Sequence, residues 1–152
     1  MNTPYKSVEI IISNSGTAIP IENRPAWRLL IIIICLKILS TDGYGLSSNK
    51  IRIGSWMALR KEKWKNYLDF LYGLDKLNSS IMPDQQLDKA ISLGICKNYW
   101  DISKTGRIEL TTDGERLFDM ITTDNAMSDE IEFLSEIKTK LTENLAKEII
   151  GE

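Results

Sequence analysis

The stretch TGRIELTTDGERLFDMI, residues 105–121, indicates the fold of this chain. Residues 107–110 have the composition of a short strand, and a helix-like pattern follows the Thr-Thr-Asp-Gly sequence at once. Thr112 or Asp113 can cap that helix, because their side-chain oxygens accept hydrogen bonds from its first backbone N–H groups. We predict that this turn brings the apolar face of the helix back onto the core, through Leu117, Phe118 and Ile121.

The segment before this stretch completes a small ribbon. CKNYWDIS (residues 96–103) and RIEL (residues 107–110) are rich in strand-forming residues, and the short loop between them contains glycine, which predicts a hairpin. A short helix precedes it, beginning at Pro83 and ending at Gly94, with Ile95 packing back after the glycine. The inward-facing residues of this helix are predicted to be Leu87, Ala90 and Ile91.

Two longer helices are predicted nearer the N-terminus. Residues 23–40 begin with Asn23 as a cap and Pro25 in the first turn, and they are apolar on nearly every side, which is typical of a buried central helix. A buried strand is the alternative, because four consecutive isoleucines favour it. Residues 54–73 are predicted to form one long helix, capped by Ser55 and ended by Gly73.

Both ends of the chain carry further elements. Residues 1–22 have an extended, β-branched pattern with a turn, which predicts a β arm or hairpin. Residues 129–150 predict one long amphipathic helix, and its apolar stripe either folds onto the chain's own core or binds a partner protein. The candidate partner-binding residues are Ile131, Leu134, Ile137, Leu141, Leu145 and Ile149. The expected fold is α+β and mostly α, with segments at 1–22, 23–122 and 123–152.

Composition argues against catalysis. The 152 residues contain no histidine, and neither of the two cysteines has a neighbouring ligand or base, so we expect no enzyme activity, no metal and no cofactor. Both cysteines are expected to be reduced core residues of a cytoplasmic protein. The longest apolar run, residues 29–36, is too short to cross a bilayer, and residues 1–10 lack the order of a signal peptide.

Charge is unevenly distributed along the chain. Residues 1–111 contain 15 basic and 10 acidic residues, whereas residues 112–152 contain 4 basic and 11 acidic ones. The basic part suggests contact with nucleic-acid phosphates, although an ordinary solvated helix face is the alternative. The candidate nucleic-acid-binding residues are Lys50, Arg52, Arg60, Lys61, Lys63 and Lys65, with Lys97, Lys104 and Arg107 in or beside the hairpin.

The helix before the hairpin offers mixed chemistry. Its exposed face is expected to carry Gln85, Asp88, Lys89 and Ser92, of which glutamine and lysine can contact bases. Asp84 and Asp88 would repel phosphates, which argues against sequence-specific binding. Tyr99 and Trp100 are better suited to packing within the ribbon than to base stacking.

The order of helices and hairpin, with LDKAISLGI (residues 87–95) and IELTTDGERLF (residues 108–118), resembles a winged-helix domain. The chain is also similar to the small middle components of bacterial three-component systems with an ABC or SMC-like ATPase, on the residues GSWMALR (54–60) and IELTTDGERLF. That resemblance implies a non-enzymatic accessory subunit in antiphage or antiplasmid defence, with the ATPase, an effector subunit and double-stranded DNA as partners. The alternative is a dimeric winged-helix transcription regulator.

Overall fold

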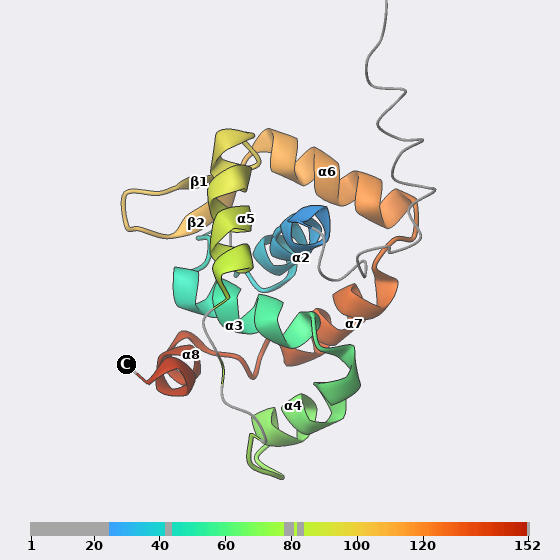
Figure 1. Cartoon of the computed structure of the whole chain (residues 1–152), viewed down its shortest axis with the longest axis vertical. Coiled ribbons are helices and arrows are strands. Elements are labelled where there is room, and N and C mark those ends of the chain that lie inside the picture. The colour runs from blue at the N-terminus through green and yellow to red at the C-terminus, as the bar shows by residue number, and fades with distance from the viewer. Residues whose placement is uncertain (1–24, 42–43, 78–80, 82–83, 152) are drawn as a thin grey trace, which may run out of the picture.

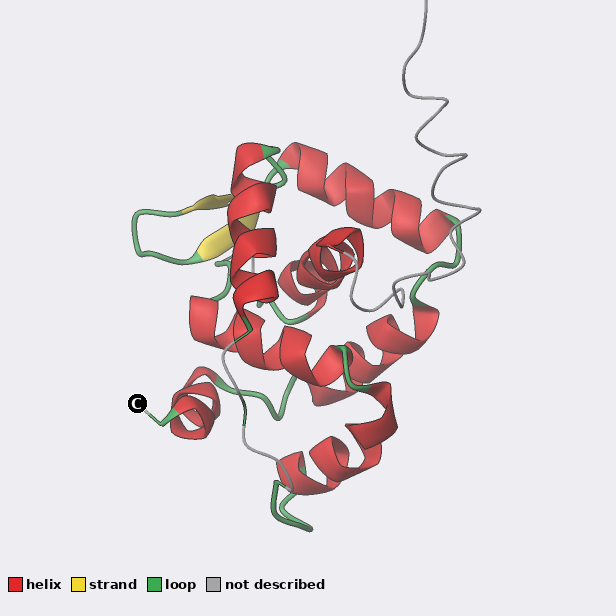
Figure 2. Cartoon of the chain, in the orientation of Figure 1, coloured by secondary structure: helices red, strands yellow, loops and turns green. Residues whose placement is uncertain are grey.

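The computed structural model describes residues 25–41, 44–77, 81 and 84–151, and this part of the chain is mostly helical with a small antiparallel sheet (Figures 1 and 2). The predicted α+β, mostly α composition is therefore confirmed for these residues. The predicted N-terminal β arm, with the Asn23 cap, lies outside them. The elements are α2 (Pro25–Ile38), α3 (Ser48–Ala58), the 3-10 turn η2 (Lys61–Lys63), α4 (Trp64–Leu71), α5 (Gln85–Cys96), β1 (Trp100–Ile102), β2 (Ile108–Leu110), α6 (Thr112–Thr123), α7 (Ser128–Ile137) and α8 (Glu143–Ile150).

Helix α2 is the centre of the core. Its residues 31–36 are all buried, and the helix contacts α3, α5, α6, α7 and β2. Figure 1 shows these helices arranged around it. The prediction of a buried central helix is confirmed, and burial on every side outweighs the weak helix propensity of the isoleucines.

The prediction of a single helix over residues 54–73 is wrong. Helix α3 begins earlier, with Ser47 as its cap, and Ser55 lies fully buried inside it. The helix ends at Ala58 because two side chains bind its last carbonyl groups. Arg60 Nη1 donates to Trp56 O at 2.9 Å, and Trp64 Nε1 donates to Met57 O at 2.9 Å. A 3-10 turn then leads into α4.

Helix α5 continues past Gly94 to Cys96, which corrects the predicted helix end. The residue that allows the chain to turn is Asn98, in the left-handed conformation at φ 63°. Gly94 is buried against the indole of Trp100, whereas Ile95 is partly exposed and does not pack back into the core. The start of the helix is capped by Asp84, whose side chain accepts from the backbone N–H groups of Gln86 and Leu87.

The predicted hairpin is confirmed as the antiparallel pair of β1 and β2, in which Asp101 lies opposite Glu109. An isolated bridge joins Leu46 to Ile108, so the segment before α3 lies along the outer side of β2. Helix α6 then begins at Thr112, capped by Thr111, whose side chain accepts from Gly114 N at 3.1 Å. The capping turn was thus predicted one residue too late.

The C-terminal segment forms two helices where one was predicted. Helix α7 ends at Ile137, and α8 begins after Thr142, whose side chain accepts from Leu145 N at 3.1 Å. Helix α7 packs on α4, where the rings of Trp64 and Phe133 stack at 4.5 Å. The prediction that both cysteines lie in the core holds for Cys35 and is wrong for Cys96, which is exposed. Burial raises the pKa of the Cys35 thiol to about 12.

Candidate nucleic-acid interface

The predicted basic cluster divides into paired and unpaired parts. On α3 and near α4, Arg52 forms an ion pair with Asp88 at 3.0 Å, and Lys61 pairs with Asp129 of α7. The hydrogen bond to Asp129 raises the pKa of Lys61. Lys65 pairs with Asp69 at 3.0 Å, as its spacing of four residues predicted. These three cations are therefore already matched by carboxylates of the same chain.

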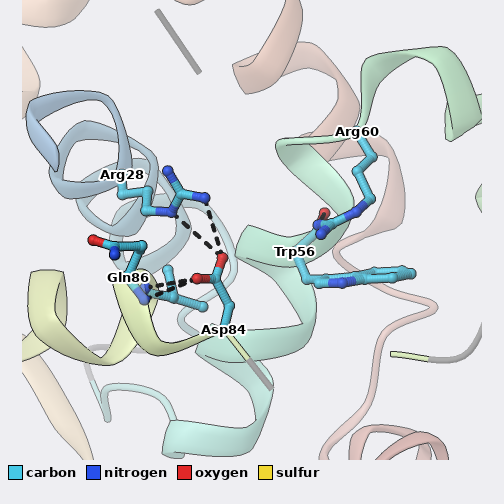
Figure 3. Close-up of polar contacts among 6 residues, drawn as sticks. Arg28, Trp56, Arg60, Asp84 and Gln86 are labelled. Carbon is cyan, nitrogen blue, oxygen red and sulfur yellow. Dashed lines mark hydrogen bonds and ion pairs between the residues drawn. The ribbon is translucent and has the colours of Figure 1, made fainter. Parts of the chain in front are cut away.

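Two arginines have structural roles beside this cluster. Arg60 lies with its guanidinium 4.4 Å from the centre of the Trp56 ring, a cation–π contact that Figure 3 shows next to the hydrogen bond described above. Arg28, from α2, holds Asp84 through contacts of 3.3 and 3.4 Å, also drawn in Figure 3. The exposed Lys63 has no ion-pair partner within the described residues.

Three further lysines belong to α5 and the ribbon. Lys89, Lys97 and Lys104 are exposed, and no ion pair involves them among the residues that the structure describes. Lys89 lies on α5, Lys97 directly follows it, and Lys104 is in the β1–β2 loop. We call the surface formed by α5 and the ribbon the α5–ribbon face; its three lysines have no ion pair within the described residues, although the ribbon also carries the carboxylates of Asp101 and Glu109.

The carboxylates of α5 do not cancel that charge. Asp84 and Asp88 were expected to repel phosphates, but each is bound by an arginine, Arg28 and Arg52 respectively. Both arginines come from other helices and lie far away in the sequence. Because arginines partly neutralise them, Asp84 and Asp88 oppose DNA contact at α5 less than the sequence alone predicts.

A groove next to the ribbon adds a residue that the sequence analysis missed. It has a volume of about 660 Å³ and is lined by Thr41, Tyr44, Ser103, Lys104, Thr105, Arg107 and Glu109. The Tyr44 side chain is 69% exposed, so its ring is available for stacking. In the sequence, Tyr44 stands between two glycines, a pattern that predicts only a turn. Trp100, by contrast, is fully buried, which agrees with its predicted packing role.

Lys50 is buried where the sequence analysis placed it on an open surface. Only 7% of this residue is exposed, and its surroundings are Glu143, Arg107 and Lys138. Burial lowers the pKa of Lys50, the two neighbouring cations lower it further, and Glu143 raises it. Arg107 is half-buried, and its Nη1 lies 3.7 Å from Glu143 Oε1.

We expect Lys50→Met to stabilise the domain at pH 7 by roughly 1 kcal/mol, because an apolar side chain removes the cost of burying charge. Between the lowered folded pKa and its ordinary value of 10.5, the unfolded chain binds more protons at Lys50 than the folded chain does. Wild-type stability at this site therefore rises with pH, and the advantage of the variant shrinks. Urea unfolding of both proteins at pH 7 and pH 10 measures the difference, and an advantage that grows with pH would contradict this assignment.

The candidate partner-binding stripe lies largely in the chain's own core, which is one of the two alternatives that its pattern left open. Leu134, Ile137 and Leu141 are fully buried, because α7 packs on α2 and α3 and Leu141, just before α8, lies beside Gly54 of α3. The remaining residues of the stripe are partly buried and pack against the same core: Ile131, Leu145 and Ile149.

Two further findings for the described part of the chain concern metal binding and membrane-spanning helices. No group of three or more acidic or cysteine side chains there is placed to hold a metal ion. None of the described helices combines the length and apolar character needed to cross a membrane. Comparisons with models of protein families, with curated proteins and with solved structures found no match for this chain.

Proposed function

We propose that this chain is a non-enzymatic winged-helix subunit that contacts the DNA backbone through the α5–ribbon face. The element order supports the fold. The segment around Leu46, which connects α2 to α3, pairs with β2, and α5 leads into the hairpin. A winged helix needs this same order of helix, strand, two helices and a two-stranded wing. The extra helix α4 between α3 and α5 is an insertion in that order.

One observation carries the proposed DNA contact. Lys89, Lys97 and Lys104 are unpaired on the α5–ribbon face, while the carboxylates of α5 are held by arginines. Lysines bind phosphates as point charges, and phosphate contacts carry no sequence information, so the expected binding is independent of sequence. Tyr44 in the adjoining groove offers a stacking surface that is equally tolerant of sequence.

We further propose that the subunit works within a bacterial SMC-like or ABC ATPase defence complex. The resemblance of residues 54–60 and 108–118 supports this assembly, and exposed apolar side chains after α4 offer a contact surface. Tyr72 is 48% exposed and Leu74 is 77% exposed. The alternative, a free-standing regulator, predicts protection of one palindromic site, whereas an accessory subunit should bind unrelated duplexes equally well.

The test compares two variants with the same change in charge. Replacing Lys89, Lys97 and Lys104 with glutamine should weaken binding to a 20-base-pair duplex roughly 10- to 100-fold at low salt. The slope of log affinity against log salt should fall by about 3, since three phosphate contacts are lost. Fluorescence anisotropy against salt concentration measures both quantities.

The control variant replaces Lys61, Lys63 and Lys65 with glutamine. It also removes three positive charges, but two of these are already paired in the folded chain. Its affinity should fall less than 3-fold by the same reasoning. A larger loss in the control than in the α5–ribbon variant would place the DNA contact at α4 and overturn the proposal.

A further inference from the structure

The start of α3, the base of the ribbon and the start of α8 meet around one carboxylate. Ser47 Oγ accepts from Lys50 N at 3.1 Å as the cap of α3, and it donates to Glu143 Oε2 at 2.5 Å. Arg107 Nη1 lies 3.7 Å from the other oxygen, Oε1, and also donates to Gly45 O at 3.3 Å. Glu143 is therefore held at a helix N-terminus by a hydroxyl group and a guanidinium, which are groups that also bind phosphate.

The positive charge around this carboxylate exceeds what it can neutralise. Lys50, Arg107 and Lys138 all act on the same small region, whereas Glu143 is the one acidic group whose charge acts on Lys50 there. Lys50 is more than nine-tenths buried as a residue, and its ammonium, which is not one of the fully buried unpartnered atoms, makes no hydrogen bond or ion pair within the described chain. Glu143 Oε1 is itself buried without a hydrogen bond. The two groups make no hydrogen bond with each other, and leaving the buried Oε1 without a donor is costly.

We propose that Ser47, Lys50 and Arg107 form a phosphate-binding site and that Glu143 of α8 occupies it in this conformation. A phosphate has more oxygen acceptors and more negative charge than a carboxylate, so it would satisfy Lys50 as well as Ser47 and Arg107. Arg107 also lines the groove that contains Lys104 and Tyr44. The site is therefore continuous with the α5–ribbon face, and the inference rests on the proposed DNA contact for the source of the phosphate.

Helix α8 is suited to leave this position. It has eight residues, of which Ala146 alone is fully buried while Leu145, Ile149 and Ile150 are partly buried against the core, and a helix so short is unstable without this packing. The preceding Leu141 is fully buried and anchors the chain just before the helix. Release of α8 beyond this anchor would expose the site without disturbing α7, so α8 acts as a cover that competes with phosphate.

The experiment uses Glu143→Gln in the full chain, with Glu148→Gln as the matched control. Both remove one negative charge from α8, but Glu148 is exposed and has no ion pair within the described chain. We expect Glu143→Gln to bind a 20-base-pair duplex about 5- to 10-fold more tightly than wild type, and Glu148→Gln to change affinity less than 2-fold. Adding Lys50→Met to Glu143→Gln should remove the gain.

A second probe separates this inference from the proposed function. Inorganic phosphate should raise the melting temperature of Glu143→Gln more than that of Glu148→Gln, whether or not the chain binds DNA. If phosphate raises the melting temperature of Glu143→Gln but its affinity for the duplex is unchanged, the phosphate site is supported and its use for nucleic acid is overturned. Equal behaviour of the two variants with both probes overturns the site itself. If Glu143→Gln does not fold, as judged by circular dichroism, Glu143→Ser provides the same comparison.

Discussion

Leu141→Asp is expected to unfold the domain, with a loss of more than about 4 kcal/mol in the free energy of unfolding. Leu141, in the short segment between α7 and α8, is fully buried and lies beside Gly54 of α3. An aspartate there would bury a charge without a partner or force the C-terminal segment away from α3. Urea denaturation followed by circular dichroism measures the loss. Thr139→Asp, two residues earlier and exposed, is the control and should change stability by less than about 0.5 kcal/mol.

The same variant distinguishes two interpretations of the C-terminal stripe. A stripe that waits for a partner protein would tolerate Leu141→Asp in the isolated chain, because the residue would already be in water. A stripe that belongs to the core would not. If Leu141→Asp were as stable as the wild-type chain, this result would contradict the observed packing and support the interface interpretation.

The sequence predicted elements well where a local signal existed. The Pro25 start and the all-round apolar pattern identified α2, and the glycine-containing loop identified the hairpin. The breaks inside the two long helical patterns had no glycine or proline to mark them. At the end of α3, the side chains of Arg60 and Trp64 donate hydrogen bonds to its last carbonyl groups. Tertiary packing determines these side-chain positions, and no local sequence pattern does. The break before α8 did have a signal, because Thr142 is a good capping residue.

The candidate site was harder to predict because charge pairing joins distant segments. Lys65 and Asp69 could be paired from their spacing alone. The pairs of Arg52 with Asp88 and of Lys61 with Asp129 cross 36 and 68 residues, so no local pattern reveals them. A count of basic residues along the chain therefore overestimated the charge available near α4 and underestimated the α5–ribbon face.

Gly94→Ala is expected to destabilise the domain by about 2 to 4 kcal/mol, although alanine is the better helix former by about 1 kcal/mol. A β-carbon at this position would lie 1.9–2.2 Å from three atoms of the Trp100 indole. That ring cannot move away easily, because it is fully buried and its Nε1 donates to Ile91 O at 3.0 Å. The overlap therefore outweighs the gain in propensity. Thermal unfolding measures the effect, with the exposed Ser92→Ala on the same helix as the control.

A double variant tests the cause of this loss. In a Trp100→Leu background the smaller side chain leaves room for the new methyl group, so Gly94→Ala should cost little and can even stabilise through helix propensity. If Gly94 instead ended the helix in a left-handed conformation, its replacement would cost the same with either residue at position 100. A penalty that depends on Trp100 therefore shows that the glycine is needed for close packing of α5 on the ribbon. That packing fixes the angle between α5 and the hairpin, and hence the relative positions of Lys89, Lys97 and Lys104 on the α5–ribbon face.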